Sequence, residues 1–412
     1  MISILDNDIF NYVLSQKELS IHFQPIVSVR NRKIVGVEAL TRSFYMNEYI
    51  SPEALFSFSK HHEKGQTLDN ICRQNTFETA KSICDNCLLF VNFEASYLKS
   101  YIEHSEDIIM SIDKSSIPKK HIVIEINEKG TNSSTDLENF IKIFRENGFL
   151  IALDDVGSGH SNLNRIAIAK PDIVKIDRQS ITDINKDYYK QEIARAIVNL
   201  SKSIGAVTVA EGVETIDEAV SCMNLNIDYF QGYYFSKAQE VEKIHNLVID
   251  NQLNTITESY TQQAKAELNN KKLHYNIYKK NLKALTASLK KAKTENFEKV
   301  LRNYVTQCCD IECIYILDIN GYQITSTILN HDIKPNDNPL FSPCKKNDCH
   351  NLKSYFYSAV ILETEFFTSH KYISIATGRL CQTNSVLFLH PNGNKYVACI
   401  DYYVSSIEKT DD

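Results

Sequence analysis

The sequence of 412 residues predicts an α/β protein with three parts: a (β/α)8 barrel, a long helical linker and a smaller α+β domain. Three observations lead to this prediction. Short apolar runs in the first 250 residues repeatedly end in a polar or ionisable residue. The next stretch has the composition of long helices, and the last hundred residues have the pattern of β-hairpins. We therefore expect domains at 1–250, 251–309 and 310–412.

The clearest apolar run, residues 149–153, ends in two adjacent acids, Asp154 and Asp155, and a Gly-Ser-Gly turn follows at 157–159. An apolar run bounded by turn residues is typical of a buried strand. Acids at the carboxyl end of such a strand lie where α/β folds build their active sites. Two neighbouring carboxylates repel each other unless a cation lies between them, so the pair predicts a metal site.

Six other apolar runs end in the same way. The residues at their ends are Glu38, Asn92, Glu125, Lys175, Glu211 and Gln231. Any one of them alone would more simply be a helix N-cap or a surface polar group. Seven such strand ends in series are typical of a TIM-type barrel whose functional site lies at one mouth.

Charge and composition exclude several classes of partner. The formal net charge of −6 argues against a nucleic-acid polymer as partner, because binding one requires a basic face. No apolar stretch reaches the roughly 18 residues of a membrane span, and the first residues do not resemble a secretory signal. We expect a cytoplasmic protein that does not bind membranes, with its 11 cysteines mostly reduced.

The stretch from about 259 to 306 is rich in Lys, Ala, Leu, Asn and Glu and predicts one or two long helices. Leu282, Leu285 and Leu289 form an apolar stripe, but no heptad pattern is sustained, so a long coiled coil is not expected. The stripe has two possible roles. It packs on the protein's own domains, or it forms a homodimer contact that transmits a signal.

Beyond about residue 310 the pattern indicates an antiparallel sheet. Runs at 314–317 and 322–325 flank the tight-turn pair Asn320-Gly321, and runs at 386–389 and 396–400 flank a second turn. We expect a further strand at 372–375 and a helix over 352–362. This part is therefore predicted to be an α+β domain.

The motifs of the first part, in their order, resemble the EAL domain of bacterial cyclic-di-GMP phosphodiesterases over roughly residues 1–250. They are FQPIV at 23–27, EALTR at 38–42, Asn92, EINE at 125–128, DDVGSG at 154–159, KID at 175–177, AEGVE at 210–214 and QGY at 231–233. The resemblance implies metal-dependent hydrolysis of one phosphodiester of cyclic di-GMP to linear pGpG. The loop after Asp155 departs from the family at Val156, His160 and Asn162 but keeps its glycines.

The resemblance also implies a set of metal ligands for two divalent ions, Mg²⁺ or Mn²⁺. Glu38, Asn92, Glu125 and Asp154 would hold one ion, and Asp154, Asp155 and Glu211 would hold the other. Oxygen ligands of this kind suit these hard cations.

Other roles follow from the same resemblance. Lys175 would orient or help to deprotonate the attacking water, and it could equally be a buried counter-ion to the acids. Asp155 and Glu214 are counted with it as catalytic. Glu128 and Glu214 would support the loop after Asp155, although both could be plain exposed acids.

Three residues are expected to contact the substrate. Arg42 would bind a phosphate through its fork of donors, or form an ion pair at the barrel rim. Gln24 and Gln231 would contact substrate or water, and for Gln24 a satisfied polar group on the first strand is nearly as good an explanation.

The last part resembles PAS/Cache-like sensor domains and implies an unknown small ligand there. Candidate pocket residues are Tyr355, Tyr372, Thr377, Arg379 and Asp401, for which ordinary core or surface roles stay open. The spacing of Cys84 and Cys87, and the group Cys344, Cys349 and His350, would allow a metal, but ordinary thiols and loop residues explain them more simply.

Two other functions are possible besides that of a regulated hydrolase. The chain could be a catalytically weak or inactive EAL domain that serves as a cyclic-di-GMP receptor, or a signalling scaffold. All the expected ligands and the lysine are present, which favours the enzyme.

Overall fold

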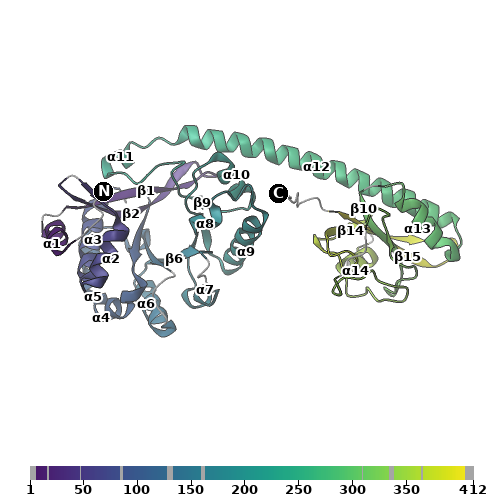
Figure 1. Cartoon of the computed structure of the whole chain (residues 1–412), viewed down its shortest axis with the longest axis horizontal. Helices are drawn as coiled ribbons and strands as arrows, with labels where there is room; N and C mark the ends of the chain where they lie inside the picture. Colours follow the sequence, from purple (N-terminus) through teal and green to yellow (C-terminus); the bar gives the residue numbers. More distant parts are fainter. Residues whose placement is uncertain are drawn as a thin grey trace. The chain divides into compact units, whose positions relative to one another are not determined.

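The computed structural model describes residues 6–15, 18–46, 48–83, 87–127, 133–158, 163–308, 310–333, 338–362 and 365–403. The chain forms two compact units, Met1–Gln263 and Ala264–Asp412 (Figure 1). Their boundary lies inside one long helix, α12 (Asp250–Lys291). The domain limits at 250 and 309 stay predictions. In the described part of the chain no helix combines the length and apolarity needed to cross a bilayer.

The first unit is a closed barrel, as predicted. Its described strands are β1 (Leu19–Ser28), β2 (Lys33–Tyr45), β4 (Leu88–Phe93), β5 (Ile122–Asn127), β6 (Leu150–Val156), β7 (Ile173–Ile176), β8 (Val207–Ala210) and β9 (Tyr229–Phe230). They follow the order β1-β9-β8-β7-β6-β5-β4-β2, and pairing of β1 with β2 closes the ring. The short β3 (Glu48–Ile50) extends β2 as a hairpin.

One strand departs from the regular (β/α)8 pattern. Strand β1 runs antiparallel to both of its neighbours, β2 and β9, whereas the pairs from β2 round to β9 are parallel. The reason is local: only a short turn separates β1 from β2, and a parallel pair would need a crossover of a dozen or more residues.

Helices lie around the outside of the strands (Figure 1). They are α1 (Asn7–Ser15), α2 (Pro52–His61), α3 (Gly65–Ala80), α4 (Leu98–Glu103), α5 (Ser105–Asp113), α6 (Ser134–Glu146), α7 (Leu163–Ala169), α8 (Arg178–Ile181), α9 (Tyr188–Ile204), α10 (Ile216–Asn224) and α11 (Val241–His245). Local sequence sets several of their ends: Thr215 and Glu218 form a capping box at the start of α10, and Gly205 closes α9 with φ +81°. The main core packs between these helices and the strands.

A small apolar layer fills the inside of the barrel and fixes where the polar groups lie. Its buried residues are Ile26, Phe90, Val123, Ala152, Ile173 and Val209. Side chains two positions apart on a strand point to the same face. The next inward positions towards the mouth are therefore Asn92, Glu125, Asp154, Lys175 and Glu211. In the antiparallel β1 the matching position precedes Ile26 and is Gln24.

Gly232, just after β9, is required by close packing of two backbone segments. A Cβ at this position would lie 2.0 Å from the carbonyl oxygen of Val213. The two segments are tied by hydrogen bonds from Val213 N to Gln231 O and from Tyr234 N to Val213 O, both 3.0 Å, so neither can easily move away.

We expect Gly232→Ala to lower the free energy of unfolding by more than about 3 kcal/mol, because backbone atoms must shift. Gly205→Ala is the control: a Cβ there meets nothing within 4 Å, and only the positive φ costs stability, about 1 kcal/mol. Urea denaturation of both variants measures the difference. Equal losses in the two variants would contradict the packing argument.

The second unit is an antiparallel sheet with helices on both faces. Its described strands are β10 (Ile311–Asp318), β11 (Ile328–Leu329), β12 (Phe367–Thr368), β13 (Tyr372–Ile373), β14 (Leu380–Leu389) and β15 (Lys395–Tyr403), in the order β11-β10-β15-β14-β12 with β13 paired to β14. Helix α14 (Ser354–Ile361) covers one face. Helix α13 (Phe297–Val305) and the end of α12 cover the other.

Most of the predicted elements of this unit are found. The hairpin of β14 and β15, the helix near 352–362 and a short strand at 372–373 are present. The strand expected at 322–325 is reduced to isolated bridges, in which Gln323 pairs with Leu317 of β10 and Tyr322 pairs with Cys349. The stripe of Leu282, Leu285 and Leu289 is buried against this sheet, so these side chains pack on the chain's own second unit.

Candidate active site at the barrel mouth

Lys175 lies at the centre of the barrel mouth, fully buried on β7. Its Nζ contacts carboxylates from four other strands: Glu211 Oε1 at 2.6 Å, Glu125 Oε1 at 2.7 Å, Asp154 Oδ1 at 3.2 Å and Glu38 Oε2 at 3.3 Å. Four acids face one ammonium group, so the cluster carries excess negative charge when its acids are ionised.

Glu38 is the best stabilised of these acids. Burial raises its pKa, but the charge of Lys175 and hydrogen bonds from Gln231 and Asn92 outweigh burial, so the pKa of Glu38 lies below its usual value. Gln231 Nε2 donates to Glu38 Oε2 at 2.6 Å and Asn92 Nδ2 donates to Oε1 at 3.0 Å. Glu38 is thus held as a carboxylate.

The other three acids have raised pKa values, because burial and nearby negative charges disfavour their ionised forms. Burial, followed by the charge of Glu38, raises the pKa of Glu125 well above its usual value, and burial with the charge of Asp154 does the same for Glu211. Burial and neighbouring acids also raise the pKa of Asp154. Burial lowers the pKa of Lys175, but the surrounding carboxylates outweigh it and raise that pKa well above its usual range. The single ammonium does not compensate all four acids.

The donor set fits divalent cations. Glu125 is fully buried, and its Oε2 has no hydrogen-bond partner among the residues that the structure describes. Asp154, Asp155 and Glu211 each offer an oxygen, and these oxygens lie within 4.8 Å of one another. A cation between them would supply the missing compensation, and oxygen donors of this kind select hard ions such as Mg²⁺, Mn²⁺ or Ca²⁺.

A strained strand end brings the two adjacent aspartates to one site. Asp155 has φ +58°, in the left-handed region, and the pairing of β6 with β7 shifts register between Leu153 and Val156. Without this irregularity the two side chains would point to opposite faces of the strand. Backbone strain of this kind persists where the surrounding structure enforces it, which is common at functional sites.

Asn127, at the end of β5, was not singled out in the sequence. Its Nδ2 donates to Asp155 Oδ2 at 2.9 Å, so it orients one of the paired carboxylates. Its position in the sequence could have indicated this role, because it lies two residues after Glu125 and therefore on the same inward face of the strand.

The expected substrate residues lie around this cluster. Gln24 pairs in register with Glu38; its Nε2 donates to Ser236 O, and Gln231 Nε2 donates to its Oε1, both at 3.2 Å. Arg42 is half-buried and donates to Thr41 O at 2.8 Å. Gln24 is thus linked to the cluster through Gln231, and Arg42 lies four residues beyond Glu38 on β2.

Glu214 and Glu128 are the two acids that the sequence predicts to support the loop after Asp155. Glu214 accepts a hydrogen bond from Arg178 Nη2 at 2.7 Å, with 40 % of its side chain exposed, and it is not in contact with the carboxylate cluster. Glu128 lies outside the described residues. Cys84 also lies outside them, and Cys87 donates to Ile83 O. Within the described ranges Cys344, Cys349 and His350 do not form a three-ligand group.

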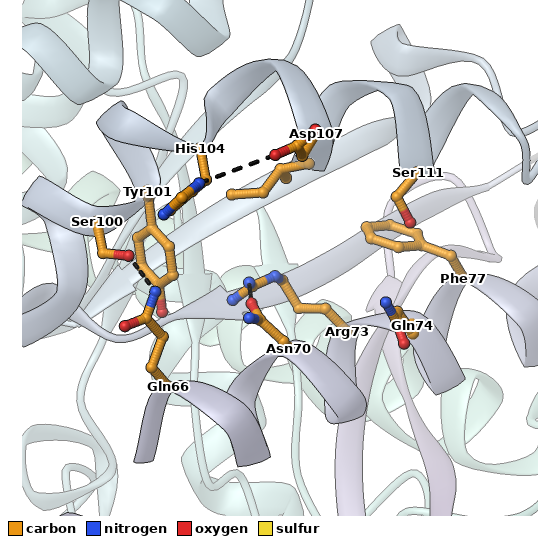
Figure 2. Close-up of a pocket in the computed structure, with 11 residues that line it drawn as sticks. Gln66, Asn70, Arg73, Gln74, Phe77, Ser100, Tyr101, His104, Asp107 and Ser111 are labelled. Atoms are coloured by element: carbon orange, nitrogen blue, oxygen red, sulfur yellow. Dashed lines mark hydrogen bonds and ion pairs between the residues drawn. The ribbon is translucent and has the colours of Figure 1, made fainter. Parts of the chain in front are cut away.

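A cavity of about 270 Å³ lies outside the barrel between α3, α4 and α5. Figure 2 shows that Arg73 projects into it from α3, between Asn70 and Gln74. The Arg73 guanidinium already pairs with Asp69 and Asn70, and it lies 4.8 Å from the ring centroid of Tyr101. The positive charge of Arg73 is therefore compensated by neighbouring side chains, whereas the carboxylates at the barrel mouth are not fully compensated.

Curated relatives of this chain carry the same domain. It is 25% identical over 402 residues to YkuI of Bacillus subtilis, an uncharacterized EAL-domain containing protein, with 95% of each chain covered. It is 29% identical over 246 residues to PdeG of Escherichia coli, a probable cyclic di-GMP phosphodiesterase, which covers 57% of this chain. The chain spans about half the length of that second relative, 47%.

Solved structures share the fold. The crystal structure of Bacillus subtilis YkuI in complex with substrate c-di-GMP and calcium superposes with a TM-score of 0.82, covering 98% of this chain and 100% of that one at 23% identity. The calcium and cyclic-di-GMP complex of Klebsiella pneumoniae BlrP1 has a TM-score of 0.51 at 25% identity, covering 55% of this chain and 57% of that one.

The family model for the EAL domain matches residues 7–238, which is more than half of the chain and spans every strand of the barrel. The polar residues that ring the barrel mouth all lie within this match. The chain therefore belongs to the EAL-domain family.

Proposed function

We propose that this chain hydrolyses one phosphodiester bond of cyclic di-GMP to give linear pGpG, with two Mg²⁺ or Mn²⁺ ions. The observation that carries the proposal is the uncompensated carboxylate cluster around Lys175, with the free Oε2 of Glu125. Relatives described as cyclic di-GMP phosphodiesterases, and neighbours solved with calcium or manganese and the dinucleotide, support it.

The proposed ligands divide between two positions. Glu38, Asn92, Glu125 and Asp154 would hold one ion, and Asp154, Asp155 and Glu211 the other. Bound divalent ions neutralise phosphate charge and lower the pKa of a coordinated water. Asp154, between the two groups, would keep the ions in one geometry.

The remaining residues would position reactants. The ammonium of Lys175 holds the carboxylates together and would orient the attacking water. Arg42 and Gln24, on the rim, would bind the phosphate and a neighbouring polar group of the substrate. Gln231 fixes Glu38 by its 2.6 Å hydrogen bond, so its effect on substrate would be partly indirect. Glu214 would act by anchoring Arg178 at the rim.

A hydrolysis assay on the purified full chain tests this proposal. Cyclic di-GMP is supplied with Mg²⁺ or Mn²⁺, with a chelated control, and the products are separated by chromatography. The proposal expects metal-dependent formation of pGpG. Tight binding without turnover would overturn it and favour the receptor, whereas absence of both binding and turnover would favour a scaffold.

Asn127→Ala tests the residue that sequence motifs missed. The substitution removes one of the hydrogen bonds that orient Asp155, so we expect Mn²⁺ affinity to fall by about 10- to 100-fold. Isothermal titration with Mn²⁺ measures this. Asn147→Ala, which alters an exposed side chain after α6, should leave the affinity unchanged. Equal effects in the two variants would argue that Asn127 has no orienting role.

We further propose that the second unit is a PAS/Cache-like sensor that regulates the barrel. A homodimer and a cytoplasmic location stay predictions from the sequence. If the second unit regulates the barrel, deleting residues after about 263 should change the rate at which the barrel hydrolyses cyclic di-GMP without abolishing it.

A further inference from the structure

The second unit contains a small polar cavity under helix α14, separate from the barrel site. Its volume is about 40 Å³, and its lining includes Cys313, Tyr315, His350, Tyr355, Tyr372 and Asp401. A single water needs about 10–15 Å³, so the cavity accepts a group of only a few heavy atoms. Exposed residues, Lys353 and Ile375, also line it, which gives a small solute a route from solvent.

Two buried carboxylates that act electrostatically on each other, of which Asp401 lines this cavity and Glu312 does not, have acceptor atoms without a partner among the described residues. Asp401 is 4% exposed; its Oδ2 accepts from the Cys313 thiol at 3.3 Å, and its Oδ1 has no hydrogen-bond partner in the described part of the chain. Glu312 is 0% exposed; its Oε1 accepts from Thr377 at 2.5 Å, and none of the described residues donates to its Oε2. A bulge in β10, between Ile311 and Cys313, leaves Glu312 out of the strand register.

No protein cation compensates these acids within the described residues. The ion pairs found in this unit join Lys279 and Lys283 to Glu365, and His331 to Asp332. His350 lines the cavity, but burial, followed by the charge of Lys353, lowers its pKa to about 4, so it is neutral near pH 7. Its Nε2 is a further buried polar atom without a partner.

Aromatic rings form the rest of the wall. The centroids of Tyr355 and Tyr372 lie 6.3 Å apart in a stacked arrangement, and that of Tyr315 lies 6.3 Å from Tyr355 and 5.3 Å from His350. The faces of tyrosine rings attract cations. A buried carboxylate beside several rings therefore selects positive charge over a neutral or anionic group.

The geometry argues against a metal ion here. Within the described part of this unit, no three ligand atoms from His, Cys, Asp or Glu approach one another within 4.8 Å. An organic cation needs fewer fixed ligands, because an ammonium group donates three hydrogen bonds and contacts rings through its carbon atoms.

From this cavity we propose that the second unit binds a small primary amine in its ammonium form, with Asp401 as the main acceptor and Tyr315, Tyr355 and Tyr372 around the cation. Of the pocket residues expected from the sequence, Tyr355, Tyr372 and Asp401 line the cavity. Thr377 orients Glu312, and Arg379 instead donates to the Tyr403 hydroxyl at 3.0 Å.

The state of Asp401 agrees with this role. Burial raises its pKa to about 7, although the hydrogen bond from the Cys313 thiol opposes this rise. A buried acid with this pKa gains its charge when a cation arrives beside it. A buried acid without a compensating cation lowers the stability of the protein when no ligand is bound. Such a loss of stability in favour of function is common at binding sites.

Saturation-transfer NMR on methylammonium, added to the full chain at constant ionic strength, tests the proposal. We expect saturable binding to the wild type and none of tetramethylammonium, which is too large for the cavity. Asp401→Asn should weaken methylammonium binding about thirtyfold or more. Asp332→Asn, at an acid whose side chain is 73% exposed, should not change it.

Two further measurements keep the test decisive. Thermal unfolding should show Asp401→Asn to be at least as stable as the wild type, since it removes an uncompensated charge. Tyr372→Leu keeps Asp401 and should weaken binding about fivefold through loss of a ring face. No binding of methylammonium by the wild type, equal binding by Asp401→Asn, or Zn²⁺ binding that depends on Asp401 would each overturn the proposal.

Discussion

Lys175→Met should destabilise the metal-free protein by about 3–5 kcal/mol, the largest loss of stability that we expect from a single change at the barrel mouth. Methionine preserves much of the apolar stem but removes the ammonium that contacts Glu38, Glu125, Asp154 and Glu211. Four buried acids then face one another without compensation. Urea denaturation with a chelator present, near pH 7, measures the loss.

The matched control is Lys186→Met, whose ammonium pairs with Asp183 on the surface with 72% of the lysine side chain exposed. Its effect should stay within about 0.5 kcal/mol. Added Mn²⁺ should stabilise the Lys175 variant more than the wild type, because the ion takes over the charge that lysine supplied. A variant as stable as the wild type without metal would mean that the acids are neutral and that the cluster is not an ion site.

Glu125→Gln should reduce cyclic di-GMP hydrolysis by more than the roughly 100-fold that loss of an outer hydrogen-bond partner costs at a metal site. Glutamine has nearly the same shape, so the fold is preserved, but one carboxylate charge and the free Oε2 are lost. Initial rates at saturating Mn²⁺ give the size of the effect, and substrate binding measured separately shows whether the loss lies in turnover.

Glu146→Gln is the control for this variant, since it removes an exposed acid at the end of α6, in the same βα unit. It should leave the rate unchanged. If Glu125→Gln kept half or more of the wild-type rate, the assignment of Glu125 as a metal ligand would be wrong.

The barrel and most of its candidate site were predictable because each relevant side chain follows a simple rule. Glu125, Asp154 and Lys175 stand two residues beyond an inward apolar side chain, so strand alternation alone places them at one mouth. The antiparallel direction of β1 was missed because apolar periodicity carries no information on strand direction. Asn127 was missed because a partner twenty-eight residues away, Asp155, gives it its role.

The second unit shows where local patterns fail. The run at 322–325 has strand-like composition and Ile324 N donates to Ile316 O of β10, but Gln323 also pairs with the loop at Asn347 and Asp348, and no regular strand forms there. Asp318 stabilises the turn because its carboxylate accepts hydrogen bonds from the backbone amides of Asn320 and Tyr322. These long-range loop contacts are not visible in a residue pattern. The same is true of the bulge that leaves Glu312 out of register beside Asp401.

The most direct test of the central claim is anomalous diffraction from crystals of the full chain grown with Mn²⁺ and cyclic di-GMP. We predict two anomalous peaks on either side of Asp154, one beside Glu38 and Glu125 and one beside Asp155 and Glu211, with a phosphate of the dinucleotide in contact with both. Absence of manganese from the barrel mouth, with the dinucleotide bound elsewhere, would contradict the account.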